Sequence, residues 1–245
     1  MTEILDIAKK DGRWTECPAC KEISITEKLK ENLSICPHCD FHFRVGPRDR
    51  MTITCGKDGF SEIDLSLSGK NVPAGEEGFK CYNAAIKGEP CIIGVMDFSF
   101  MGGTMGTALG QSVMSMLDYS SAEKTPAIIF CASGGVRVQE GIWGLMQMIR
   151  TVYRKNISTA PLITVYTDPC YGGVTASFSS QADFIIAEQG ARIGFAGPRV
   201  IETTTHAELP GDFQTASRTL SNGFVDAVVH RREIPQTLYY ILKWL

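Results

Sequence analysis

Two pairs of cysteines near the N-terminus have the residue type and the spacing needed to hold a metal ion. Cys17 and Cys20 stand in the first pair, CPAC, and after fifteen intervening residues Cys36 and Cys39 stand in the second pair, CPHC. This spacing is typical of a four-cysteine structural zinc site. Because four thiolates leave no open position on the ion, the sequence predicts one zinc ion that stabilises a small module and takes no part in catalysis.

Other roles for this module are less favoured. A redox-active CxxC would seldom occur twice at this spacing, and His38 and His42, which could replace a cysteine ligand, are expected to be surface residues beside a knuckle. Arg44, Arg48 and Arg50 form a small basic group that could contact phosphate. Residues 1–50 contain nine Lys and Arg and nine Asp and Glu, so the overall charge of this region does not favour nucleic acid.

Two glycine pairs each stand between a strand-like apolar run and a helix-like run. Gly134-Gly135 follow AIIFCAS, and Gly172-Gly173 follow PLITVYTD. Glycine lets backbone amides approach a ligand without an intervening Cβ, and amides at the start of a helix attract negative charge. The two turns therefore predict a site that stabilises an oxyanion with backbone amides. The alternative, that both pairs only permit tight turns, is equally compatible with the pattern.

No side chain near these turns has the pattern of a catalytic nucleophile. The frame around Ser133 lacks the first glycine of a G-x-S-x-G elbow. Asp168 and Glu140 fit helix-capping and helix-dipole roles better than acid–base catalysis. The stretch MGGTMGTALG, which contains Gly102 and Gly103, lacks the lysine of a nucleotide-binding loop, although a phosphate could still rest on the helix that it opens.

The elements around these motifs predict three regions. Residues 1–46 form the zinc ribbon, residues 47–80 a linker of irregular structure or a short helix, and residues 81–245 the main domain. The main domain begins with two strands joined by a turn at Lys87-Gly88 and continues with strands, glycine turns and helices in alternation. This order predicts an α/β fold with parallel strands, in which ADFIIAE and ARIGFAG form a strand pair.

The length and composition indicate a folded protein. The chain has 245 residues, 44% hydrophobic and 21% charged, and its net charge of −3 gives no global reason to bind nucleic acid or anionic membranes. Its apolar runs are too short for membrane insertion, and the N-terminal segment lacks the apolar core of a signal peptide. We therefore expect a cytoplasmic protein whose other cysteines are reduced and mostly buried, namely Cys55, Cys81, Cys91, Cys131 and Cys170.

Several segments together resemble the beta subunit of the bacterial acetyl-CoA carboxylase carboxyltransferase. They are CPAC…CPHC, MGGTMG, ASGGVRVQEG, LMQM, TDPCYGGVTASF and IGFAGPRVIE, and the resemblance runs from Trp14 to near the C-terminus. It implies a crotonase-type α/β fold preceded by a four-cysteine zinc ribbon. It also implies transfer of a carboxyl group from carboxybiotin to acetyl-CoA, which gives malonyl-CoA for fatty acid or related polyketide synthesis within an ATP-dependent complex.

The resemblance implies partners as well. These are an alpha subunit of similar fold without the zinc module, in an alpha2beta2 heterotetramer, and the biotin carboxyl carrier protein. The active site would lie between the subunits. The released biotin nitrogen can serve as the base, which explains the absence of a side-chain base.

The same resemblance implies roles for the glycine turns. The enolate oxygen of the acetyl group needs fixed donors, which we expect from Gly172 and Gly173, while Gly134 and Gly135 shape the thioester side. Arg137 could face a coenzyme A phosphate, the subunit interface or an ion-pair partner. The residues expected to contact the substrate are Arg137, Gly102, Gly103, Tyr171, Phe195, Gly197 and Pro198.

The sequence departs from the family pattern at four positions. The family commonly has alanine and methionine where Val136 and Val138 stand, and two threonines where Cys170 and Tyr171 stand. Tyr171 is bulky and adjoins the expected oxyanion donors, so these differences leave the shape of the pocket and the choice of acyl-CoA open, and the chain could be either the housekeeping copy or a specialised paralogue. Two other functions are alternatives: a stand-alone crotonase-type acyl-CoA hydratase or decarboxylase, and a regulator that binds nucleic acid through its zinc ribbon. Weak nucleic-acid binding through the ribbon is also compatible with the main hypothesis.

Overall fold

The computed structural model describes residues 12–64 and 78–245. The chain divides into two compact units, Met1–Val45 and Gly46–Leu245. Of the segment predicted to be an irregular linker, residues 65–77 lie outside the described residues. The part before them contains helix α3 (Pro47–Cys55) and strand β3 (Phe60–Glu62), which belong to the larger unit.

The smaller unit is built around a hairpin and a short helix. Strands β1 (Trp14–Glu16) and β2 (Ile23–Ile25) pair antiparallel, and helix α2 (Thr26–Glu31) follows directly. The first cysteine pair lies in the turn between the two strands, and the second lies beyond α2. The unit has little regular structure, so its packing depends on an ion bound between its cysteines.

The larger unit contains an eight-stranded mixed sheet. The strand order is β10-β8-β7-β6-β5-β4-β3, with β9 paired to the end of β7. The strands not yet given are β4 (Phe79–Ile86), β5 (Glu89–Met96), β6 (Ala127–Ser133), β7 (Leu162–Tyr171), β8 (Phe184–Glu188), β9 (Ile193–Gly194) and β10 (Ala227–Val229). From β5 to β10 the paired strands are parallel, which confirms the predicted α/β class.

Two local predictions about the strands have different outcomes. The turn at Lys87-Gly88 is confirmed: both residues have positive φ, and β4 and β5 pair antiparallel on either side of it. The expected pairing of β8 with β9 is wrong. β8 pairs with the first part of β7, and β9 pairs with its last two residues, because β7 runs on to Tyr171 and offers each short strand a separate section.

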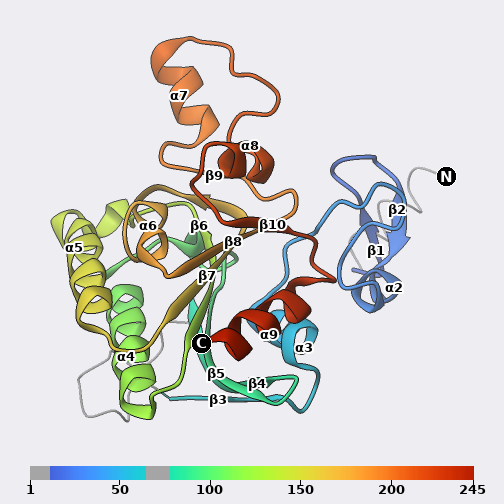
Figure 1. Ribbon diagram of the computed structural model, residues 1–245. Coiled ribbons are helices and arrows are strands. Elements are labelled where there is room, and N and C mark those ends of the chain that lie inside the picture. Colours follow the sequence, from blue (N-terminus) through green and yellow to red (C-terminus); the bar gives the residue numbers. More distant parts are fainter. Residues whose placement is uncertain (1–11, 65–77) are drawn as a thin grey trace. The chain divides into compact units, whose positions relative to one another are not determined.

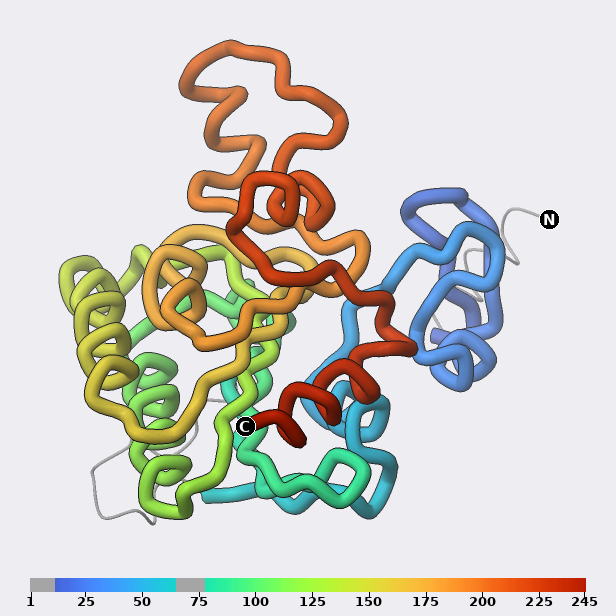
Figure 2. The backbone as a smooth tube through the Cα atoms, viewed as in Figure 1, coloured from blue at the N-terminus to red at the C-terminus, as the bar shows by residue number. Residues whose placement is uncertain are grey.

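Helices cover both faces of the sheet (Figure 1). Helices α4 and α5 lie on one face, and α3 and α9 lie side by side on the other, although they are far apart in the sequence (Figure 2). The helices beyond α3 are α4 (Thr107–Glu123), α5 (Ile142–Ile157), α6 (Gly172–Thr175), α7 (Pro198–Thr205), α8 (Ala216–Ser221) and α9 (Ile234–Trp244). Among the described residues, no helix is both long enough and apolar enough to cross a lipid bilayer.

Alternating side chains of the central strands form two hydrophobic cores. Along β6, Ile129 and Cys131 belong to the core under α4, while Ile128 and Phe130 belong to the core under α3 and α9. All four side chains are buried. Burial on both faces explains why the strand sequences read as continuous apolar runs, and it makes the ends of these strands a rigid base for the glycine turns.

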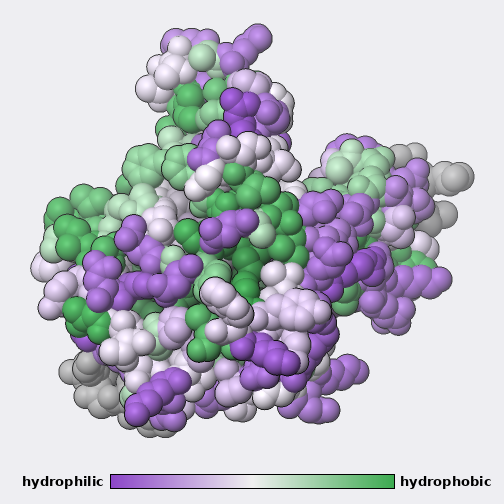
Figure 3. Space-filling model, viewed as in Figure 1, coloured by the Kyte–Doolittle hydropathy of each residue, from purple (hydrophilic) through white to green (hydrophobic). Residues whose placement is uncertain are grey.

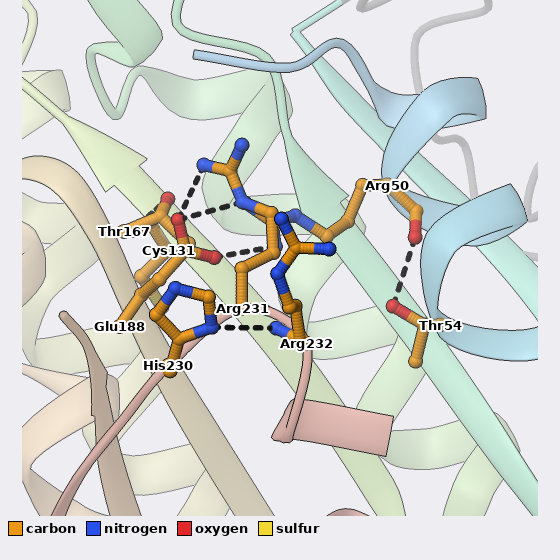
Figure 4. Close-up of polar contacts among 8 residues, drawn as sticks. All are labelled: Arg50, Thr54, Cys131, Thr167, Glu188, His230, Arg231 and Arg232. Carbon is orange, nitrogen blue, oxygen red and sulfur yellow. Dashed lines mark hydrogen bonds and ion pairs between the residues drawn. The ribbon is translucent and has the colours of Figure 1, made fainter. Parts of the chain in front are cut away.

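A buried ion network joins α3 to the far end of the sheet (Figure 4). Arg50 Nη1 lies 2.6 Å from Glu188 Oε2, and Arg231 Nε donates to Glu188 Oε1 at 3.0 Å. All three residues are at most 3% exposed, and burial lowers the pKa of Arg231 while Glu188 opposes this effect. The hypothesis that Arg50 contacts phosphate is therefore wrong, because its guanidinium is buried against Glu188.

Candidate active site and zinc site

The four cysteines of the CxxC pairs meet in one cluster. Their sulfur atoms all lie within 4.8 Å of one another, with Cys17 Sγ 3.6 Å from Cys39 Sγ and Cys20 Sγ 3.7 Å from Cys36 Sγ. A zinc ion with Zn–S bonds of about 2.3 Å in a regular tetrahedron needs sulfur–sulfur separations of about 3.8 Å. The cluster therefore fits zinc.

The two knuckles share one backbone design. In the first, the amide of Lys21 donates to Cys17 O and that of Cys17 donates to Glu22 O; in the second, Asp40 donates to Cys36 O and Cys36 to Phe41 O. Each knuckle turns its chain through a residue with positive φ, at Lys21 and at Asp40. Equal spacing in the sequence thus becomes equal geometry around the cluster.

The pKa values of the thiols indicate that the cluster needs a bound cation if all four cysteines are to be ionised. Burial opposes ionisation of Cys17, but the amides of Cys20 and Ala19 prevail and lower its pKa to about 7. Desolvation and the neighbouring sulfurs raise the pKa of Cys39 to about 12. Four thiolates therefore do not ionise together near neutral pH unless a cation supplies the opposing charge.

The two glycine turns touch each other. They follow β6 and β7, which are neighbours in the parallel part of the sheet. Gly135 and Gly172 have φ of 119° and 66°, and a Cβ on Gly172 would lie 2.7 Å from Gly135 Cα. Glycine is needed at these two positions because of close backbone approach, so a tight-turn role accounts for one glycine of each pair.

Most of the glycine amides are already used inside the protein. Gly134 donates to Gly102 O at 2.8 Å, Gly135 to Ser133 Oγ at 3.0 Å, and Gly172 to Phe195 O at 2.8 Å. The amides of Gly173 and Val174 are buried and have no hydrogen-bond acceptor within the described part of the chain. A buried amide without an acceptor is unfavourable, so these two are the donors that an oxyanion would satisfy.

Ser133 fixes the first turn. Its side chain is fully buried, its hydroxyl donates to Gly103 O at 2.7 Å, and it accepts from the amide of Gly135 at 3.0 Å. Gly103 approaches the end of β6 so closely that a Cβ would lie 2.1 Å from Ala132 O. The residue that looked like an incomplete nucleophile therefore holds two loops together.

Arg137 and Glu140 close the start of α4. Glu140 Oε2 accepts from the amide and the hydroxyl of Thr107, at 2.7 and 2.6 Å, and Glu140 Oε1 lies 3.3 Å from Arg137 Nη1. Burial opposes ionisation of Glu140, but the bonds from Thr107 and the charge of Arg137 lower its pKa. Of the roles considered for Arg137, the geometry is that of an ion pair. The Glu140 carboxylate also lies at the start of α4, the place where the sequence analysis considered a bound phosphate.

The other predicted substrate residues lie around the second turn. Phe195 is 68% exposed, and its carbonyl accepts from Gly172. Tyr171 is half-buried, with its ring near Gly197, and Pro198 begins α7. Of the four positions that depart from the family pattern, Val136 bears most directly on the amides: a Cβ on Gly173 would lie 2.2 Å from its Cγ2.

An apolar cavity beside α6 contains residues that sequence reasoning missed. Its volume is about 320 Å³, and Gln214 spans its wall, donating to Ala196 O at 2.7 Å. Its lining includes Thr175, Ile193, Phe195, Phe213, Gln214 and Phe224. Thr175, Ile193 and Phe195 stand in the family motifs TDPCYGGVTASF and IGFAGPRVIE, but Phe213, Gln214 and Phe224 stand in no motif, so nothing in the sequence indicated that these three line the same cavity.

Comparisons with known families agree with both units. The carboxyl transferase domain model matches residues 46–245, and the acetyl-CoA carboxylase zinc finger domain model matches residues 14–39. Among solved structures, the transcarboxylase 12S subunit superimposes with a TM-score of 0.72 at 24% identity, over 89% of this chain and 44% of that one. The Pseudomonas malonate decarboxylase heterodimer gives 0.65 at 20% identity, over 82% and 85%. The fold and site thus define a carboxyl transferase domain of the crotonase type with a zinc ribbon.

Curated relatives narrow the class. The acetyl-coenzyme A carboxylase carboxyl transferase subunit beta of Carboxydothermus hydrogenoformans is 39% identical over 253 residues, covering 96% of this chain and 90% of the relative. That of Prochlorococcus marinus (strain MIT 9515) is 38% identical, covering 97% and 89%. A Natranaerobius thermophilus protein named as subunits beta/alpha is 40% identical, covering 95% of this chain and 42% of the relative. The chain belongs to the acetyl-CoA carboxylase carboxyl transferase subunit beta family.

Proposed function

We propose that this chain is the beta subunit of a carboxyltransferase that moves the carboxyl group of carboxybiotin, delivered on a carrier protein, to acetyl-CoA. The product would be malonyl-CoA, the subunit would act with an alpha-type subunit, and the complex would be cytoplasmic. Family membership supports the reaction class. The structural observation that carries the proposal is the pair of open, buried amides at Gly173 and Val174.

The amides would act on the acetyl thioester. Loss of a methyl proton leaves negative charge on the thioester oxygen, and donors already aimed at that position stabilise it without reorganisation. One such donor contributes about 2.7–4 kcal/mol in comparable sites. Carboxybiotin supplies the carboxyl group. The N–C bond of carboxybiotin would break to release CO2, the freed ureido nitrogen would take a methyl proton of the acetyl group, and the resulting enolate carbon would form its bond to the carbon of CO2.

The hydrogen bonds refine the predicted roles of the four glycines. Gly173, with Val174, would donate to the oxyanion, while Gly172 would set the turn through its bond to Phe195 O. Gly134 and Gly135 would act by shape, because their amides are used by Gly102 O and Ser133 Oγ. The contacts of substrate with Tyr171, Phe195, Gly197 and Pro198 remain predictions.

The zinc proposal rests on the sulfur cluster. The cysteines Cys17, Cys20, Cys36 and Cys39 would hold one structural ion, with all four positions filled by thiolates. The ion would stabilise the smaller unit, which has only two short strands and one short helix in its described part.

A stand-alone hydratase or decarboxylase is less well supported. Such an enzyme would need a positioned side-chain acid or base. The two acids predicted near the turns both accept hydrogen bonds from backbone amides: Glu140 from Thr107, and Asp168 from Arg192 at 3.2 Å.

The deciding experiment combines the full chain with the alpha-type subunit of the same organism, biotinylated carrier and acetyl-CoA. We expect malonyl-CoA to form only when the two subunits are mixed, and mass spectrometry of the thioesters measures it. Failure of the assembled pair to carboxylate any acyl-CoA would contradict the proposal. Turnover of an enoyl- or malonyl-thioester by the isolated chain would instead favour the stand-alone enzyme.

A further inference from the structure

Strand β9 and the residue after it hold the second glycine turn from one side. The amide of Gly172 donates to Phe195 O at 2.8 Å, and Thr175 Oγ1 donates to Gly194 O at 2.8 Å. The two residues with open amides stand between these attachment points in the sequence. The direction of the open amides therefore depends on where Gly194 and Phe195 lie.

Packing alone does not fix this segment. The apolar cavity of about 320 Å³ adjoins it, and Ile193, Gly194 and Phe195 all line that cavity. Residues 197–213, which contain α7, project from the rest of the larger unit in Figures 1 and 2, and α7 buries none of its residues. Figure 3 shows hydrophobic side chains, in green, where this projecting part joins the rest of the unit. A strand end in a close-packed interior is held by its neighbours, but this one borders a hollow.

Gln214 joins the two ends of the projecting part. Its backbone carbonyl accepts from the amide of Ile193 at 2.8 Å, and its side-chain Nε2 donates to Ala196 O at 2.7 Å. The same side chain lies directly against Gly194, where a Cβ would come within 2.1 Å of Nε2. One residue of the returning chain therefore holds the departing chain at three places.

This arrangement of Gln214 is locally unfavourable. Its φ is 59°, in the left-handed region that residues other than glycine rarely adopt. Its Oε1 is buried and has no hydrogen-bond partner within the described part of the chain. Each of these features costs stability. A residue kept for stability alone would not combine them, so the two costs together indicate a functional role for this side chain.

We infer that Gln214 is a positioning residue of the proposed active site: it holds β9 and Phe195, and through them it aims the two open amides at the oxyanion. The inference rests on the proposed function. Gln214 acts through β9 and the turn rather than by contact with the thioester. Position matters on this scale, since a misplacement of about 1 Å can lower turnover about 100-fold.

The test compares two glutamines that make the same bond. Gln214 donates to Ala196 O and Gln147, on the buried side of α5, donates to Trp143 O, both at 2.7 Å. Methionine has a similar shape and cannot donate. In the full complex, with the alpha-type subunit in excess, we expect Gln214→Met to lower kcat about ten-fold or more. The KM for acetyl-CoA should change by less than about two-fold, because donors to the enolate act mainly in the transition state. Gln147→Met should change kcat by less than about two-fold.

Stability is the second readout. Gln214→Met removes one hydrogen bond and also one buried acceptor that has no partner. Its unfolding midpoint should therefore lie within about 4 °C of that of the unaltered chain. Gln214→Asn keeps an amide and suits the left-handed backbone, but its side chain is one methylene too short to make the bond to Ala196 O. It should lower kcat in the same way, and it serves as the test if the methionine variant does not fold.

The outcomes separate this inference from the proposed function. If the unaltered complex makes malonyl-CoA and the Gln214 variants keep kcat within about two-fold, the inference is wrong and the proposed function stands. A loss of kcat that Gln147→Met reproduces would also overturn the inference, because any lost bond would then have this effect.

A readout without turnover covers the remaining case. If the unaltered complex carboxylates no acyl-CoA, the proposed function fails, and NMR of the isotope-labelled chain still tests the positioning. Gln214→Met should then shift the amide signals of Gly173 and Val174 more than Gln147→Met does. Unmoved signals would overturn the positioning role of Gln214.

Discussion

The cysteine knuckles and the glycine turns are both repeated motifs, but repetition has different consequences in the two places. The two CxxC pairs adopt the same hydrogen-bond pattern and contribute equally to one sulfur cluster. The two glycine pairs look equally alike in sequence, yet one turn uses both of its amides internally and the other leaves Gly173 open. A knuckle carries its ligands on its own side chains, whereas the state of a turn's amides depends on acceptors that come from elsewhere in the chain.

The largest expected effect tests the equivalence of the knuckles. Cys20→Ser and Cys39→Ser replace the second cysteine of each pair, so both should release zinc and unfold the smaller unit. Structural zinc contributes about 10 kcal/mol or more in small modules. Cys55→Ser, outside the cluster, is the control. Metal content per chain and limited proteolysis measure the result, and retention of zinc by only one of the two ligand variants would show that the knuckles are not equivalent.

The second prediction tests the difference between the turns. Gly172→Ala places a Cβ 2.7 Å from Gly135 Cα at a φ of 66°, whereas Gly134→Ala meets nothing closer than 3.4 Å and has no positive φ. We expect the first substitution to lower the free energy of unfolding by about 2–4 kcal/mol and to abolish carboxyl transfer. The second should cost less than about 1 kcal/mol. Urea denaturation measures both, and equal losses would contradict the asymmetry.

The sequence predicted the parts that depend on local pattern. The cysteine spacing indicated the sulfur cluster, and the apolar runs separated by glycine turns indicated the parallel sheet. It did not predict that Ser133 bonds Gly103 O, because that contact joins loops thirty residues apart. Nor did it predict which side of α5 faces the protein, since periodicity identifies an apolar face but not its direction. The burial of Arg50 was also missed, because its partner Glu188 lies on a strand that is distant in the sequence.

The third prediction concerns the Ser133 hydroxyl, which joins the first glycine turn to the loop at Gly103. Ser133→Ala removes a hydroxyl that bonds both Gly103 O and the amide of Gly135. Leaving these buried groups without a partner should cost about 1–3 kcal/mol. Ser99→Ala, at an exposed serine whose hydroxyl bonds only Asp97, is the control. If the Ser133 variant unfolds at the same urea concentration as the Ser99 variant, the hydroxyl does not hold these loops together.

The smallest effect concerns the hydrogen bonds from Thr107, at the start of α4, to Glu140, which follows the first glycine turn. This effect depends on pH. Thr107 and Arg137 lower the pKa of Glu140 in the folded chain, so its contribution to stability is fully present above the ordinary glutamate pKa and is lost as pH falls through the lowered value. Glu140→Gln should therefore cost about 1 kcal/mol near neutral pH, as for loss of a helix cap, and progressively less below about pH 4. Glu202→Gln on exposed α7 is the control. Unfolding midpoints from pH 3 to pH 8 would test this. A pH-independent difference between the two variants would mean that the carboxylate charge of Glu140 does not stabilise the turn, and that only its shape matters there.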